Sequence, residues 1–405
     1  MSRDKIKYFQ KAGGKSIPDD KDSPLAGKHI QSICTQAWEA TWSRFYRNDT
    51  HLFYDYLSSY EPGHELAHLP AADEVRRQYP NIYGYGTGME DCMISAGVML
   101  CLITDRYAVT GDETLRELAD AVFQGIQLCA TAHGIPGFLA RAVCAEDLKG
   151  IYINSSRDQY THAVHGLWHY FRSPLCGIER KAEIGTIVSA IADRMIRNVT
   201  PENDYDSLRA DGTRDTHGIS RMWNVKGHEA ARLPMLYAAA WDVTGRQVYH
   251  EMYRRYLEPA VEQSLDFEGG QPTYALLQMQ CSLELLSLLE QDKSLKKKMH
   301  GIMKRISKLC AGRAINADCL ARGLDLTMVG PDWRKSGGLV GEYRKVWYCI
   351  RESGEAALAQ LIGNREKFSR SQQELLAQAI TRIDCGQVSS GGIFYLQAAY
   401  WKGTD

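Results

Sequence analysis

Residues 109–126 read Val109-Thr-Gly-Asp-Glu-Thr-Leu115-Arg-Glu-Leu-Ala-Asp-Ala-Val-Phe-Gln-Gly-Ile126 and show how this chain builds its helices. The segment opens with a glycine turn, which ends one apolar helix and lets the next begin almost at once. Apolar side chains then recur every three or four residues, at Leu115, Leu118, Ala119, Val122, Phe123 and Ile126. That spacing places them on one face of a helix, so the segment predicts a short turn followed by an amphipathic helix.

The same short turn recurs along the chain. Val243-Thr244-Gly245 repeats it after another helical pattern, and comparable turns are expected near Ser173-Pro174, at 290–292 and at Gly363-Asn364. After the last of these turns, Ser371 and Glu374 have the spacing of a capping box that starts the next helix. Residues 275–289 are apolar on nearly all sides, which is typical of a buried helix, and alternating strand patterns are few. The chain is therefore predicted to be mainly α.

The opposite ends of the predicted helices are joined by long connections rich in glycine, aromatic and charged residues: 48–90, 133–157, 198–228, 264–274, 311–350 and 384–391. Connections longer than about 15 residues inside a compact domain are usually functional. If helical hairpins pack side by side, the short turns lie on one face and the long connections on the other. We therefore predict an all-α fold, an (α/α)6 toroid over residues 28–405 with a cleft on the long-loop face, preceded by a flexible arm at 1–27. A helical solenoid is the alternative, but its connections should be more uniform.

Composition excludes several classes of protein. The chain has 405 residues, with 48 Lys and Arg against 49 Asp and Glu, so it has no basic surface excess for nucleic acid. Its uninterrupted apolar runs are short, so no membrane span is expected. The eleven cysteines are scattered and none forms a Cys-x-x-Cys pair, which favours buried thiols in a reducing compartment. We expect a cytoplasmic protein, or a periplasmic one if an export signal has been removed, and leave the oligomeric state open.

Polar side chains gather where the long connections enter the predicted inner helices. Five such junctions lie at 83–91, 154–165, 223–232, 266–271 and 342–352. Acidic residues in a first helical turn are favoured by the helix dipole whatever the function, but five junctions at the same depth in a ring favour a site. The candidate catalytic residues are Glu90, Asp91, Asp158 and His228. The candidate substrate-binding residues are His68, Tyr85, Arg157, Gln159, Tyr160, His162, His217, Arg221, Trp223, Glu229, Arg344 and Trp347.

One literal motif points elsewhere. His64-Glu65-Leu66-Ala67-His68 matches the His-Glu-x-x-His pattern of zinc proteases, which needs both histidines on one stable helix. Pro62-Gly63 precedes the motif and Pro70 follows it, so little helix remains to hold the ligands. We expect instead a loop that carries His68 towards a polar substrate, and we predict neither a metal nor a cofactor.

Aromatic residues are frequent in the long connections. The chain has 22 Tyr and 8 Trp, and Trp223, Trp333 and Trp347 lie in or beside the predicted loops. An exposed ring there could stack on the C–H face of a sugar, or it could anchor its own loop. The pattern leaves both interpretations open.

With these junctions, the chain resembles the six-hairpin toroid enzymes that act on carbohydrates. These include unsaturated glucuronyl hydrolases and related glycosidases, toroid polysaccharide lyases and the N-acylglucosamine 2-epimerase group. Arg157-Asp158-Gln159 at a helix start resembles the acid-bearing helix start of the uronyl hydrolases, which would make Asp158 a general acid or base. Gly227-His228-Glu229 is similar to the Gly-His helix start of the epimerases, although Lys226 replaces the usual proline.

The leading hypothesis is a glycoside hydrolase for polysaccharide degradation. It would use Asp158 with Glu90 or Asp91 as its carboxyl pair and an oligosaccharide as its substrate. The candidate histidines and arginines suggest a uronic acid in that substrate. A lyase is the first alternative, with Tyr160, His217 or His228 as the base. A sugar epimerase that uses His228 and a second histidine is another, and a non-catalytic glycan-binding toroid is the last.

Overall fold

The computed structural model describes residues 23–336, 341–363 and 368–404. Its only sheet in that part of the chain is a two-stranded antiparallel pair, β1 (Tyr46–Arg47) and β2 (Leu52–Phe53), in which Tyr46 lies opposite Phe53. The helices are α1 (Lys28–Ala40), α2 (Ala72–Arg76), α3 (Cys92–Thr110), α4 (Leu115–Thr131), α5 (Arg157–Arg172), α6 (Ile178–Asn198), α7 (Arg232–Thr244), α8 (Gln247–Leu265), α9 (Thr273–Leu289), α10 (Lys293–Ala321), α11 (Trp333–Ser336), α12 (Gly341–Gly363), α13 (Arg370–Thr381) and α14 (Ile393–Thr404).

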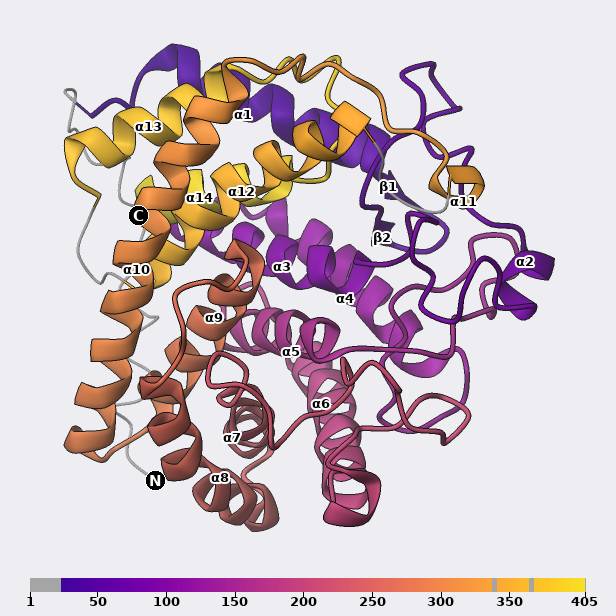
Figure 1. Ribbon diagram of the computed structural model, residues 1–405, viewed down its shortest axis with the longest axis vertical. Coiled ribbons are helices and arrows are strands. Elements are labelled where there is room, and N and C mark those ends of the chain that lie inside the picture. Colours follow the sequence, from indigo (N-terminus) through magenta and orange to yellow (C-terminus); the bar gives the residue numbers. More distant parts are fainter. Residues whose placement is uncertain (1–22, 337–340, 364–367, 405) are drawn as a thin grey trace.

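Six helices form a closed inner ring. Each packs against the next in the order α3, α5, α7, α9, α12 and α14, and α14 returns to pack against α3. The outer helices α4, α6, α8, α10, α13 and α1 surround this ring (Figure 1). The sixth pair joins the two ends of the described chain, because α14 packs against α1. This arrangement confirms the predicted (α/α)6 toroid.

The glycine turns lie where the sequence places them. Helix α3 ends at Thr110, and Gly111 takes a left-handed φ of 65° that releases the chain into α4. Helix α7 ends in the same way at Gly245, with a φ of 70°. The predicted apolar stripe of α4 is buried at five of its six positions, and Leu118 is partly buried.

Close helix packing inside the ring depends on small residues. A Cβ built on Gly97 of α3 would lie 2.1 Å from the backbone oxygen of His162 on α5. A Cβ on Gly354 of α12 would lie 2.5 Å from the backbone nitrogen of Leu396 on α14. These glycines let neighbouring inner helices approach until their backbones touch, which draws the ring together.

Two details of the sequence prediction were wrong. Helix α10 continues to Ala321, through the first part of the connection predicted at 311–350. The capping box of α13 uses Ser369 and Gln372 instead of Ser371 and Glu374, so the helix begins two residues earlier. In the predicted arm, Leu25 is buried and Ser23 donates a hydrogen bond to Gln373, so residues 23–27 pack on the ring. Residues 1–22 of that arm lie outside the described part.

Helix α3 is more apolar than the sequence analysis expected of any segment in the chain. It is the one helix in the described part that is long and apolar enough to cross a membrane, because Thr104, Asp105 and Arg106 interrupt it only briefly. About two thirds of its most apolar window (67%) is buried inside the protein, between α5, α14 and α4. Its hydropathy is therefore that of a core helix that is covered on most sides.

Candidate active site

A cluster of charged and aromatic side chains gathers where the inner helices begin, and we call it the loop-face site: Asp91, Asp158, Arg232, Tyr274 and Arg351. Arg351 reaches it from the middle of α12. Asp91 immediately precedes α3, Asp158 is the second residue of α5 and Arg232 begins α7. Tyr274 is the second residue of α9, and the charges of Asp158, Arg351 and Arg232 act on its phenol. Five of the six inner helices thus contribute to the site.

Two carboxylates of the site reach solvent. The side chain of Asp91 is 21% exposed and that of Asp158 is 30% exposed. Arg351 donates to Asp91 at 2.9 Å, and Gln159 donates to its other carboxylate oxygen at 3.3 Å. Burial and the charges of both carboxylates raise the pKa of the Tyr85 hydroxyl. Asp91 and Asp158 therefore both face the part of the toroid where Tyr85 lies.

Asp158 is held in its ionised form. Burial alone would raise its pKa, but the charges of Arg232 and Arg157 and a hydrogen bond from Arg232 outweigh burial and lower the pKa. The Arg232 side chain is almost fully buried, so its charge acts on Asp158 with little screening by water.

Asp91 belongs to a larger buried acidic cluster around Arg351. The guanidinium of Arg351 also contacts Glu355 at 2.6 Å and Asp55 at 3.7 Å. Burial and the neighbouring carboxylates raise the pKa of Asp55, and burial raises that of Glu355 to about 7. One arginine cannot balance this many carboxylates, so part of the cluster holds protons near neutral pH.

Glu90 is the member of this cluster that the sequence singled out. Burial and the charge of Asp91 raise its pKa to about 7. Its Oε1 accepts a hydrogen bond from the Gly86 backbone at 3.2 Å. Its buried Oε2 has no hydrogen-bond partner among the described residues. Glu90 is therefore a buried carboxylic acid beside an exposed carboxylate, a combination that is common at catalytic sites.

The His-Glu-x-x-His motif does not form a helix. Residues 61–69, all within the described part, form successive turns in which His64 is exposed and His68 is buried. His68 Nδ1 contacts Ser58 Oγ at 3.0 Å, and burial lowers the pKa of His68 to about 3. A Cβ on Gly88 would lie 2.6 Å from His68 Nε2, so the histidine packs directly under the glycine loop that precedes Glu90.

The predicted arginine Arg157 supports a loop. It forms an ion pair with Glu229 and donates to the backbone oxygens of Gly218 and Arg221, so its guanidinium is occupied. His228 lies beside this pair, with Nε2 3.9 Å from Glu229, and burial lowers its pKa. Its buried Nδ1 has no hydrogen-bond partner in the described chain.

Several predicted binding residues offer no exposed side chain to the loop-face site, although Trp347 lies against Arg351, whose Cζ is 5.0 Å from the centre of its ring. Tyr160 is fully buried, and its hydroxyl accepts from the Leu139 backbone. Trp347 packs in an aromatic cluster with Tyr56, Trp333 and Tyr343, whereas Trp223 packs edge-on against Tyr256. These rings anchor loops, so they are not available as exposed platforms.

The remaining candidates have other surroundings. His162 is buried one helical turn after Asp158, and His217 is hydrogen-bonded to Tyr83. Arg221 pairs with Asp204, and the exposed Arg344 lies against Tyr348.

The exposed aromatic rings near the site are tyrosines. Tyr85 is 45% exposed and stacks on Tyr83, while Tyr348 is 40% exposed on α12. Arg141 lies under Tyr85, where it donates to the Glu90 backbone oxygen at 2.8 Å. The sequence analysis missed Arg141, Tyr274 and Tyr348 as site residues. Arg232 and Arg351 fall inside the predicted junctions at 223–232 and 342–352 but were not among the candidates, although two arginines so close to acidic residues were a usable signal.

Comparisons with known proteins give structural neighbours only. No protein-family model matches the chain, and no curated protein matches it. A sugar epimerase from a ruminal bacterium is similar with a TM-score of 0.49 and 12% identity, covering 92% of this chain and 98% of that one. The α-1,6-mannanase GH76A from Salegentibacter sp. HEL1_6 has a TM-score of 0.41 and 13% identity, covering 82% of this chain and 99% of that one. The closed ring of inner helices in this chain defines its fold by itself.

Proposed function

We propose that this protein is a carbohydrate-active enzyme, and specifically a glycoside hydrolase that cleaves oligosaccharides containing a uronic acid. The observation that carries the proposal is the pair of partly exposed carboxylates, Asp91 and Asp158, on the adjacent helices α3 and α5, each held by a buried arginine. Hydrolysis of a glycosidic bond needs two such carboxyl groups, one protonated and one ionised.

The two carboxyl groups differ in the way this reaction requires. Asp158 is ionised because Arg232 and Arg157 lower its pKa, so it suits the base that takes a proton from the attacking water. Glu90 holds a proton near pH 7, because burial and the charge of the neighbouring Asp91 carboxylate raise its pKa. We assign proton donation to the leaving glycosidic oxygen to Glu90, with the partly exposed Asp91 beside it.

The surrounding charges favour an acidic sugar. Asp158 pairs with Arg232 and Asp91 pairs with Arg351, whereas Arg141 forms no ion pair within the described residues and its charge still reaches Asp158. A uronate carboxylate would balance that charge. The exposed rings of Tyr85 and Tyr348 can pack against the C–H face of a sugar.

The lyase alternative has weaker support. Tyr160 is buried and bonded to the Leu139 backbone, and burial raises the pKa of Tyr274 to about 12, which makes it a poor base near neutral pH. His228 is the better candidate, because its lowered pKa keeps it neutral near pH 7. A lyase or an epimerase would therefore depend on His228 instead of Asp158.

A panel of uronate-containing oligosaccharides tests the proposal. We expect new reducing ends without ultraviolet absorbance from a new C=C bond. Asp158→Asn should lower turnover by about 10²–10⁴-fold, and Asp91→Asn should also lower it. Asp112→Asn is the matched control, because Asp112 is an exposed carboxylate in the turn between α3 and α4. Absorbance that rises with cleavage, or full activity of Asp158→Asn, would refute the hydrolase assignment.

A further inference from the structure

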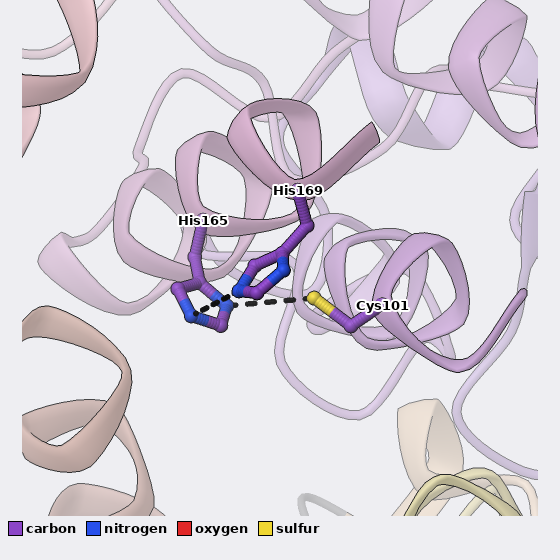
Figure 2. Close-up of side chains that lie close together, drawn as sticks. All are labelled: Cys101, His165 and His169. Carbon is purple, nitrogen blue, oxygen red and sulfur yellow. Dashed lines mark hydrogen bonds between the residues drawn. The ribbon is translucent and has the colours of Figure 1, made fainter. Parts of the chain in front are cut away.

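A second polar cluster lies inside the ring, on the side of the loop-face site nearer the C-terminal ends of the helices. It contains Cys101 of α3, His165 and His169 of α5, and Glu284 of α9. His165 follows Asp158 by seven residues of α5, which is about 10 Å along a helix axis. Figure 2 shows the two imidazoles and the thiol pointing towards one another. The cluster is therefore separate from the proposed catalytic carboxylates.

Three atoms of the cluster form a tight triangle. His165 Nε2 and His169 Nε2 are 3.2 Å apart, and Glu284 Oε2 lies 2.8 Å from the first and 3.3 Å from the second. Around a tetrahedral zinc ion with bonds of about 2.0–2.1 Å, neighbouring ligand atoms are about 3.3 Å apart. The triangle has the size of one face of such a site, and a single ion would satisfy all three atoms.

Cys101 contacts the other nitrogen of the first histidine. Its Sγ lies 3.5 Å from His165 Nδ1. When Nε2 of a histidine binds a metal, Nδ1 carries the hydrogen and donates it to a neighbouring group, which fixes the orientation of the ring. The Cys101 thiol is placed to accept that hydrogen bond and thus to position His165 as a ligand.

Space beside the triangle can admit an ion. A cavity of about 20 Å³ is lined by Cys101, His165, His169 and Lys402, and it can hold one water-sized particle. Glu284 lies outside this lining. Lys402 lies 3.9 Å from Glu284 Oε1, which leaves Oε2 as the ligand atom of that carboxylate.

We propose that this cluster binds one divalent ion of the zinc type through His165 Nε2, His169 Nε2 and Glu284 Oε2, with Cys101 as a positioning residue. The ion would join α5 to α9 inside the ring. Its role is structural, because His165 and His169 lie about two and three helical turns below Asp158. The site is independent of the proposed hydrolase function, and it departs from the metal-free protein expected from the sequence.

Metal analysis of the purified full chain tests this proposal. After expression with zinc, followed by extensive dialysis, we expect about one zinc ion per chain in the wild type. His169→Gln and Glu284→Gln should lose it, whereas Cys101→Ser should retain it with weaker affinity. His133→Gln is the matched control, because His133 is a partly buried histidine that follows the outer helix α4. A wild type that purifies without zinc and takes up none on addition would overturn the proposal.

Thermal unfolding gives a second readout and also shows whether each variant is folded, because only a folded variant has an unfolding transition. Zinc at about a hundredfold excess over its Kd should raise the Tm of chelator-treated wild type by roughly 3 °C. The same addition should leave His169→Gln unchanged, while His133→Gln should respond as the wild type does. An equal response of His169→Gln would exclude this histidine pair as the site.

Discussion

Replacing Arg232 with methionine tests how the loop-face site holds Asp158. Arg232 is almost fully buried and forms an ion pair with Asp158, whose side chain is 30% exposed. Removing one partner of a buried ion pair costs about 3–5 kcal/mol, because the other charge is left uncompensated. Since water partly screens Asp158, we expect the lower end of that range, about 3 kcal/mol for Arg232→Met.

The expected change in Tm follows from the size of the chain. At about 2.1 cal/mol/K per residue, 405 residues have an unfolding entropy of roughly 0.85 kcal/mol/K. A loss of about 3 kcal/mol then lowers the Tm by about 3–4 °C. Differential scanning calorimetry at pH 7 measures this shift. The double variant Asp158→Asn/Arg232→Met should regain part of the loss, because it leaves no unpaired charge.

The effect should also depend on pH with a definite sign. Arg232 lowers the pKa of Asp158 in the folded protein below its ordinary value of 3.8. The stabilisation is therefore fully present above that value and is lost as the pH falls through the lower folded pKa. The Tm difference between wild type and Arg232→Met should stay constant from pH 7 to about pH 4 and shrink only as the pH falls below 3.8. A shift below 1 °C at pH 7, or one that grows in acid, would refute the reasoning.

Three further substitutions probe the acid, the ring and the lyase alternative. In the wild type, we expect activity to fall as the pH rises through about 7, because Glu90 loses its proton there. Glu90→Gln should lower turnover by about 10²-fold or more and abolish this pH dependence. An unchanged pH profile would exclude Glu90 as the source of the proton. Gly97→Ala should destabilise the protein by about 3 kcal/mol, because its Cβ would meet the His162 backbone oxygen. An unchanged midpoint of urea unfolding would contradict that packing. Tyr160→Phe should cost about 1 kcal/mol of stability, because the hydrogen bond from the Leu139 backbone is lost, and it should leave kcat unchanged. A loss of kcat at full stability would instead favour a catalytic tyrosine.

Much of the fold could be predicted because its signals are local. The glycine turns at Gly111 and Gly245, the stripe of α4 and the apolar α9 each follow from a few neighbouring residues. The prediction of a connection at 311–350 overlooked such a signal, because Ala311, Ala314, Ala317 and Ala321 are spaced by three or four residues and continue the helical pattern of α10. Closure of the ring by α14 and α1 depends on contacts between the two ends of the chain, which no local pattern encodes.

The site was predictable in position but only partly in the partners of its residues. Acidic junctions identified Asp91 and Asp158 because a ring brings helix starts together. The ion-pair partners of the arginines could not be predicted from the sequence in the same way. Arg157 is occupied by Glu229 and the loop backbone, while Arg232 and Arg351 hold the two carboxylates. Which arginine pairs with which acid is set by the rotation of each helix in the ring, a tertiary property.

The second cluster was hidden for a similar reason. His165 and His169 lie four residues apart on α5, which is the spacing of two ligands on one helix face. The same spacing is also common for core histidines, so it carried little weight by itself. Only the approach of Glu284 from α9 and Cys101 from α3 distinguishes the pair.

The most direct test of the hydrolase assignment is mass spectrometry of products formed from a uronate oligosaccharide in water enriched in oxygen-18. A hydrolase that activates water at Asp158 must place one heavy oxygen in a product for each bond cleaved, and Asp158→Asn must form little of it. Products that carry no heavy oxygen and are lighter by one water for each bond cleaved would identify β-elimination. That result would contradict the assignment of Asp158 as the base.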